Sequence, residues 1–220
     1  DLIAYQDKDY AEAYLAVIAR TRSAEGSLPD CDPQLPLTEA VTRHLYRVMA
    51  YKDEYEVARL FSDGRFKAQL AQKFSGPYSL KFHMAPPLIA SKDPATGRPR
   101  KLSLPHWTLY LFSVLAKLKV LRGSRLDVFG YAAERREERA YAKAYQADLA
   151  HILDNLCQNN YEIAVSIAQL PAEVRGFGHI KHANKARTEI QRATLLKRFD
   201  RATAEIFSTA KATHPGNKAT

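Results

Sequence analysis

The chain has 220 residues, 46% of them apolar, which is enough for one domain with a hydrophobic core or for two close subdomains. No stretch approaches the roughly 18 uninterrupted apolar residues of a membrane span, and no signal peptide is recognisable, so we expect a cytoplasmic protein. The chain opens at Asp1, without Met and already in an apolar pattern, and we therefore expect a piece of a longer polypeptide.

Apolar residues at helical spacing predict helices through most of the first 76 residues. The first of these helices should hold Tyr10 and Tyr14 and stop at Gly26. A proline-rich loop follows, and Thr38 has the side chain of an N-cap for the next helix. Two shorter helices should carry Tyr55 to Phe61 and Phe66 to Phe74.

The segment 76–101 interrupts the helical pattern because it carries five of the eleven prolines of the chain. Alternating apolar residues predict a strand there, and Asp93–Gly97 has turn chemistry. We predict a β-hairpin at about residues 78–101, in a mainly α-helical, bundle-like fold. Residues 1–207 should form one helical domain, or subdomains 1–76 and 102–207 joined by residues 77–101.

The second half predicts four more elements and a tail. A helix from Trp107 to Leu121 is apolar nearly all round, so we expect it to be buried in a core or against another domain. Longer amphipathic helices should cover 132–156 and 178–207, with a shorter one around Ile163 to Leu170. Residues 208–220 have the composition of a disordered tail.

Common catalytic and metal motifs are not found in the sequence. There is no Gly-Asp-Gly motif for thiamine diphosphate, no P-loop, no GxGxxG after a strand, no HExxH and no GxSxG. Cys31 and Cys157 are far apart, so we predict two buried free thiols and no local iron–sulfur or zinc site. The carboxylates Asp53, Glu54 and Glu56 lie on successive sides of a helix near Lys52 and Arg59, which favours ion pairs over acid–base catalysis. We predict no catalytic, cofactor-binding or metal-binding residue in this chain.

The net charge of +9 is concentrated in two blocks. Residues 91–126 hold eight Lys and Arg against one acidic residue, and residues 175–220 hold ten against three. Such blocks can attract phosphates or acidic proteins, or can be solvated helix faces. We predict two groups of basic side chains that bind an anion or form an interface. A strand and its turn would bring the first group together, and the start of a helix would bring the second together. Their members are Lys81, His83, Arg98 and Arg100 in the first, and Arg175, His179, Lys181 and His182 in the second.

Five runs carry a family resemblance. They are 51–60, 82–90, 93–101, 126–131 with 134–136, and 175–181, and they follow in this order over most of the chain. They resemble the C-terminal region of the fused indolepyruvate ferredoxin oxidoreductases, which are thiamine-dependent 2-oxoacid oxidoreductases. The run Ser103-Leu104-Pro105-His106-Trp107 departs from the Phe-Gly-Pro-Trp expected there.

The resemblance implies a parent enzyme that oxidatively decarboxylates aryl 2-oxoacids to acyl-CoA and reduces ferredoxin. Its cofactors would be thiamine diphosphate, magnesium and 4Fe–4S clusters, held outside this chain. The chain itself would be a non-catalytic accessory domain that packs on the catalytic domains or on a second protomer of a homo-oligomer. Ferredoxin docking, or covering of the acyl-carrier site, is a further role that the resemblance allows.

As the alternative function, the chain would be a stand-alone helical module that binds anions or nucleic acid. The positive charge permits binding of nucleic acid, but no helix-turn-helix, zinc finger or ribonucleoprotein motif accompanies it. We therefore do not expect a nucleic-acid partner, and we expect no membrane partner.

Overall fold

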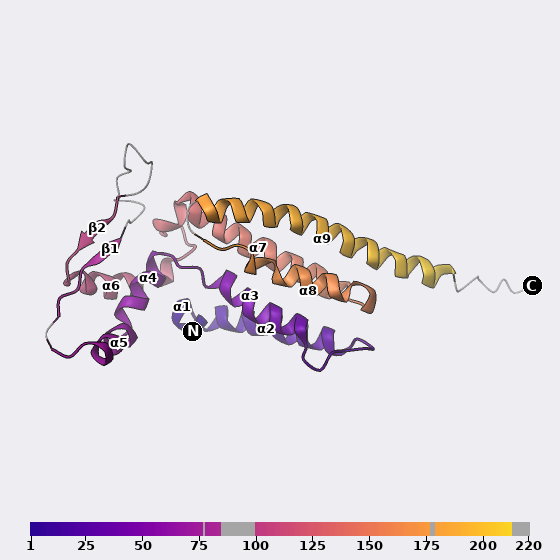
Figure 1. Cartoon of the computed structure of the whole chain (residues 1–220), viewed down its shortest axis with the longest axis horizontal. Helices are drawn as coiled ribbons and strands as arrows, with labels where there is room; N and C mark the ends of the chain where they lie inside the picture. The colour runs from indigo at the N-terminus through magenta and orange to yellow at the C-terminus, as the bar shows by residue number, and fades with distance from the viewer. Residues whose placement is uncertain (77, 85–99, 177–178, 213–220) are drawn as a thin grey trace, which may run out of the picture. The chain divides into compact units, whose positions relative to one another are not determined.

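The computed structural model describes residues 1–76, 78–84, 100–176 and 179–212. The fold is mainly α-helical with one small antiparallel hairpin, as the sequence predicted (Figure 1). Two compact units divide the chain, and each combines segments that are distant in the sequence. Unit 1 consists of Asp1–Tyr10 and Ala50–Ala140, and unit 2 consists of Ala11–Met49 and the chain from Tyr141 onward.

Unit 1 contains short helices and the hairpin. The elements within it are α1 (Leu2–Tyr5), α4 (Glu54–Ser62), α5 (Arg65–Lys73), β1 (Phe82–Met84), β2 (Leu102–Leu104), α6 (Thr108–Lys117) and the 3₁₀ helices η1 (Leu118–Leu121) and η2 (Phe129–Tyr131). The strands pair with Phe82 opposite Leu104 and Met84 opposite Leu102. The alternation predicted for Tyr78 to Met84 is confirmed only at its end, where Phe82 is buried and its neighbour His83 is exposed, whereas Tyr78 is exposed and lies outside β1. The expected turn at Asp93–Gly97 lies outside the described residues.

An aromatic cluster forms the core of unit 1. Phe82 of the hairpin and Phe112 of α6 are buried, with ring centroids 5.3 Å apart in an edge-to-face arrangement. Phe61 of α4 lies 5.2 Å from Phe82, and Phe66 of α5 lies 5.0 Å from Phe61. Edge-to-face pairs stabilise a core by about 0.5–1.5 kcal/mol each beyond the effect of burial. This cluster therefore fixes the hairpin and α6 against α4.

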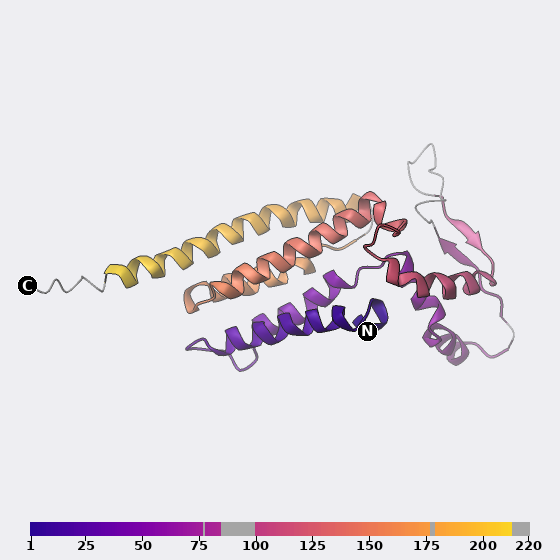
Figure 2. The same cartoon turned by 180° about the vertical axis from the view of Figure 1, so that it is seen from behind.

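Unit 2 contains the long helices. It takes in most of α2 (Lys8–Gly26) and α7 (Ala133–Asp154), and all of α3 (Pro36–Met49), η3 (Gln158–Asn160), α8 (Tyr161–Gln169), η4 (Leu170–Ala172) and α9 (His179–Ala212). Within this unit α8 packs on α3 and on α9, which Figure 2 shows from behind. The apolar stripe of α3 is buried, and the Tyr145 hydroxyl of α7 donates to the Ala168 carbonyl of α8 at 2.7 Å.

The start of α3 differs from the sequence-based prediction. Thr38 is not the N-cap, because the helix begins two residues earlier at Pro36. The fully buried carboxylate of Glu25 takes that role. It accepts hydrogen bonds from the backbone N–H groups of Leu37 and Thr38, both at 2.8 Å, and from the Thr38 hydroxyl at 2.6 Å. The Tyr161 hydroxyl donates a fourth bond at 2.7 Å. Glu25 thereby ties α2, α3 and α8 together.

The long C-terminal helix extends further than the sequence predicted. Helix α9 continues to Ala212, past the expected end near residue 207, and residues 213–220 lie outside the described part of the chain. In the described ranges, none of the helices combines the length and the apolar character needed to cross a membrane.

Candidate functional site

Helix α6 of unit 1 presents two different apolar faces. Its inner face carries Leu109 and Phe112, which are each only 7% exposed in the aromatic core. Its outer face leaves large apolar side chains in water, with Tyr110 77% exposed and Val114 59% exposed. We call this outer face the α6 stripe, and its members are Trp107, Tyr110, Leu111, Val114 and Leu118.

The spacing of the α6 stripe is that of a helix face made for packing. Counted from Trp107, just before α6, its members stand at positions i, i+3, i+4, i+7 and i+11, the last of them at the start of η1, which places them on one side of a helix. Single exposed apolar residues are common on monomers, but a contiguous group of this size marks an interaction surface. The sequence predicted that this helix is buried in a core or against another domain, and within the chain the structure buries one side of it.

Along the sequence, the charged residues on either side of the α6 stripe have one sign. No Asp or Glu occurs between Asp93 and Asp127, whereas Arg100, Lys101 and Lys117 are exposed in this segment. A partner surface that matches it would be apolar at its centre with carboxylates at its rim.

The first predicted basic group is only partly placed. Lys81, His83 and Arg100 have exposed side chains, with Lys81 and His83 on the same side of the extended segment, and Arg98 lies outside the described residues. Within the described ranges no hydrogen bond or ion pair joins the three, so the structure does not gather them into a site. Their exposure is compatible with the rim of an interface.

The second predicted basic group is brought close to residues that the sequence did not single out. Gly176 precedes α9 with a positive φ of 99°, a backbone conformation that glycine adopts without strain. Before it, Arg175 is exposed and close to Arg47 of α3, which donates to the carbonyl of the neighbouring Val174. Lys181 and His182 lie in the first turns of α9, Lys181 half-buried and His182 exposed, while the side chain of His179 is outside the described part.

His44 lies in the same region of unit 2 as Arg175. It is a buried residue of α3, and its Nδ1 has no hydrogen-bond partner among the described residues. Burial lowers the pKa of His44, and the guanidinium groups of Arg47, Arg43 and Arg175 lower it further. This cluster could not be predicted from the sequence, because residues 43–47 have only the pattern of one turn of an amphipathic helix.

The carboxylates at 53–56 form separate ion pairs and no acid–base centre. Glu56 pairs with Arg59 at 2.7 Å, as predicted, but Asp53 and Glu54 pair with Arg122 and Arg135, which are distant in the sequence. The predicted role of Lys52 is not seen. Burial raises the pKa of Glu54 in spite of the neighbouring Arg135. The group stabilises unit 1 and lacks the convergent geometry of catalysis.

Arg122 is the centre of the buried network in unit 1. Its guanidinium binds both oxygens of Asp53, at 2.5 and 2.9 Å, and donates to the Tyr5 carbonyl at 2.6 Å and to Gln6 Oε1 at 2.7 Å. The Asp53 carboxylate also accepts from the Glu56 backbone N–H as the N-cap of α4. All these polar groups are satisfied within the chain, which is typical of a structural network.

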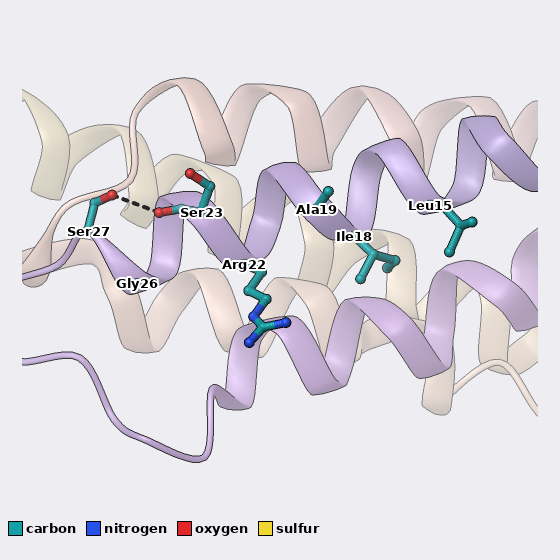
Figure 3. Close-up of a pocket in the computed structure, with 7 residues that line it drawn as sticks. All are labelled: Leu15, Ile18, Ala19, Arg22, Ser23, Gly26 and Ser27. Atoms are coloured by element: carbon teal, nitrogen blue, oxygen red, sulfur yellow. Dashed lines mark hydrogen bonds between the residues drawn. The ribbon is translucent and has the colours of Figure 1, made fainter.

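A shallow groove of about 740 Å³ lies along α2 in unit 2 (Figure 3). Its residues all belong to one helix and the turn that follows it: Leu15, Ile18, Ala19, Arg22, Ser23, Gly26 and Ser27. The Ser27 hydroxyl donates to the Ser23 carbonyl at 2.7 Å, so this hydroxyl is already used within the turn. Arg22 is the one ionisable residue in the lining. Ligand sites need several convergent polar groups, so this groove is not a candidate site.

Among the described residues, no three His, Cys, Asp or Glu side chains lie close enough together to hold a metal ion. Cys31 and Cys157 are free thiols, but both are half-buried, whereas the sequence-based prediction was full burial.

Comparison with known proteins gives one family. Residues 1–194 match the model of DUF6537, described as a family of unknown function. No curated protein and no solved structure shows significant similarity to the chain.

Proposed function

The chain belongs to the DUF6537 family, and we propose that it is a non-catalytic assembly domain of a larger 2-oxoacid:ferredoxin oxidoreductase. The α6 stripe carries this proposal. Its role is to pack on the catalytic domains of the parent polypeptide, so that unit 1 becomes part of a larger core. The sequence resemblance to indolepyruvate ferredoxin oxidoreductases supports the choice of parent.

The size of the α6 stripe supports docking. Complete burial stabilises a large apolar side chain by about 1.5–3 kcal/mol. The five members are partly exposed, so covering them would contribute on the order of 5 kcal/mol before the ordering costs of association. That amount suffices for a stable contact within one polypeptide, where the partner is already tethered.

The partner is identified by its chemistry. The stripe fits an apolar groove that takes residues at i, i+3, i+4 and i+7 of a helix, with carboxylates at its edge for Lys117 and Lys101. We assign this groove to the catalytic domains of the parent. Docking on a second copy of this chain is the competing outcome of the test.

The reactive groups belong to the rest of the parent in this account. Thiamine diphosphate with magnesium would supply the carbanion chemistry, and 4Fe–4S clusters would carry electrons to ferredoxin, in a cytoplasmic enzyme. The residues of this chain shape and shield the surroundings of that chemistry. The chain alone is therefore expected to give no turnover with thiamine diphosphate, a 2-oxoacid and CoA.

Charged residues on the α6 stripe should disable the parent and leave this chain folded. We expect Tyr110→Asp with Val114→Asp to reduce 2-oxoacid-dependent ferredoxin reduction by the native polypeptide at least tenfold, because two buried carboxylates would oppose docking. The urea unfolding midpoint of the isolated chain should stay unchanged, since both side chains are exposed.

Ile190→Asp provides the matched control. Ile190 is a 72% exposed apolar residue on α9, and its replacement should leave ferredoxin reduction intact. Equal losses in the control, full activity in the double variant, or turnover by the isolated wild-type chain would each contradict the proposed function. If the double variant keeps ferredoxin reduction but converts a dimer of the isolated chain into a monomer, the stripe packs on a second copy of this chain instead.

A further inference from the structure

Two arginine side chains of unit 2, Arg47 and Arg175, donate hydrogen bonds to the same short loop, outside the α6 stripe. Arg47 Nη2 donates to the Val174 carbonyl at 3.0 Å, which places its side chain next to residue 175. Arg175 Nε donates to the Ala172 carbonyl at 2.6 Å, and the Arg175 carbonyl accepts from Asn184 Nδ2 at 2.9 Å. Backbone groups of one short loop therefore hold both arginines in place.

The two arginines have no acidic partner. In the described ranges, neither Arg47 nor Arg175 has a carboxylate within ion-pair distance, whereas the neighbouring Arg43 is paired with Glu39 at 2.7 Å. Each guanidinium uses one nitrogen for a backbone carbonyl, and a guanidinium carries five N–H donors. Most of the donors of both side chains are thus available at an exposed position.

The surroundings of this pair favour an anion. His44, one turn before Arg47 on α3, is buried with an unpaired Nδ1, which costs about 1–3 kcal/mol unless a further group binds there. The first turn of α9 contains no acidic residue, and its second turn supplies the Asn184 contact. The start of a 34-residue helix adds positive potential at this end.

We propose that Arg47 and Arg175 bind the phosphate group of a small molecule. Two planar guanidinium forks match the several oxygens and the double charge of a phosphate better than they match one carboxylate. This site is independent of the α6 stripe, since it lies in the other unit and uses none of the same residues.

Titration of the full chain with inorganic phosphate, followed by the Nε–Hε NMR signals of the arginines, tests the site. We expect saturable shifts of the Arg47 and Arg175 signals. Arg47→Gln and Arg175→Gln should each weaken the apparent affinity about tenfold, since each removes one charge-assisted contact of about 1.5 kcal/mol. The backbone amide spectrum of each variant reports whether the fold is kept.

Arg187→Gln is the matched control, because Arg187 is exposed on α9 and the change removes the same charge. It should leave the phosphate affinity unchanged. Equal weakening in the control, or shifts that rise without saturation, would overturn the site in favour of general electrostatic attraction. Tight binding of an RNA oligonucleotide that depends on Arg187 and Lys197 as strongly as on Arg175 would overturn it as well.

Discussion

Replacing Glu25 by Ala should lower the free energy of unfolding by about 3–5 kcal/mol, because it removes the acceptor of four hydrogen bonds in a dry site. The loss leaves the backbone N–H groups of Leu37 and Thr38 and the Tyr161 hydroxyl without their partner. Helix α3 would then begin uncapped against α2 and α8. Urea unfolding followed by circular dichroism measures the effect.

Two further variants separate capping from general charge effects at this helix start. Glu25→Gln keeps the shape and one acceptor oxygen but turns an NH₂ group toward N–H donors, so we expect a loss of about 2 kcal/mol. Glu39→Ala removes an exposed carboxylate from the first turn of the same helix and should cost less than about 1 kcal/mol. A Glu25→Ala chain as stable as the Glu39→Ala chain would refute the capping role.

Arg122→Met should destabilise unit 1 by about 3–5 kcal/mol, because the buried Asp53 carboxylate would lose its counter-charge. The Met side chain keeps the packing over the Tyr5 ring, whose centroid lies 3.9 Å from the guanidinium carbon. The variant therefore isolates the loss of charge and hydrogen bonds. Thermal unfolding and urea titration both report it.

Combining Arg122→Met with Asp53→Asn should recover part of that stability, because Asn is neutral and can still cap α4. Arg125→Met, an exposed change three residues further on, serves as the control and should have little effect. If the double variant is less stable than Arg122→Met alone, the unpaired carboxylate is not the source of the loss.

The elements of this fold could be predicted from local patterns, but their partners could not. Helical spacing predicted α7 at nearly its true bounds and located α3, and alternation predicted the strand around Phe82. The cap of α3 was assigned to Thr38 because a local cap is the usual one, whereas the true acceptor, Glu25, lies on another helix. Its contacts depend on how α2 packs, and sequence spacing does not determine packing.

The candidate sites, too, depend on packing that local sequence patterns do not predict. The apolar run from Trp107 to Leu121 was visible in the sequence, but which of its faces would stay exposed depends on the hairpin and α4 that cover the other face. Arg175 was recognised from its glycine-rich run, while Arg47 and His44 were missed because nothing local distinguishes them from an ordinary helix turn. Both sites exist only once distant segments are packed.

The contact made by the α6 stripe in the native polypeptide is the most direct test of the assembly role. A photoreactive amino acid placed at position 110 would be activated by light, and the cross-linked peptides would be identified by mass spectrometry. The docking account predicts cross-links to peptides beyond these 220 residues, in a region that carries the thiamine diphosphate motif. Capture of solvent alone at position 110 would contradict it, because the stripe would then be an exposed surface with nothing docked on it.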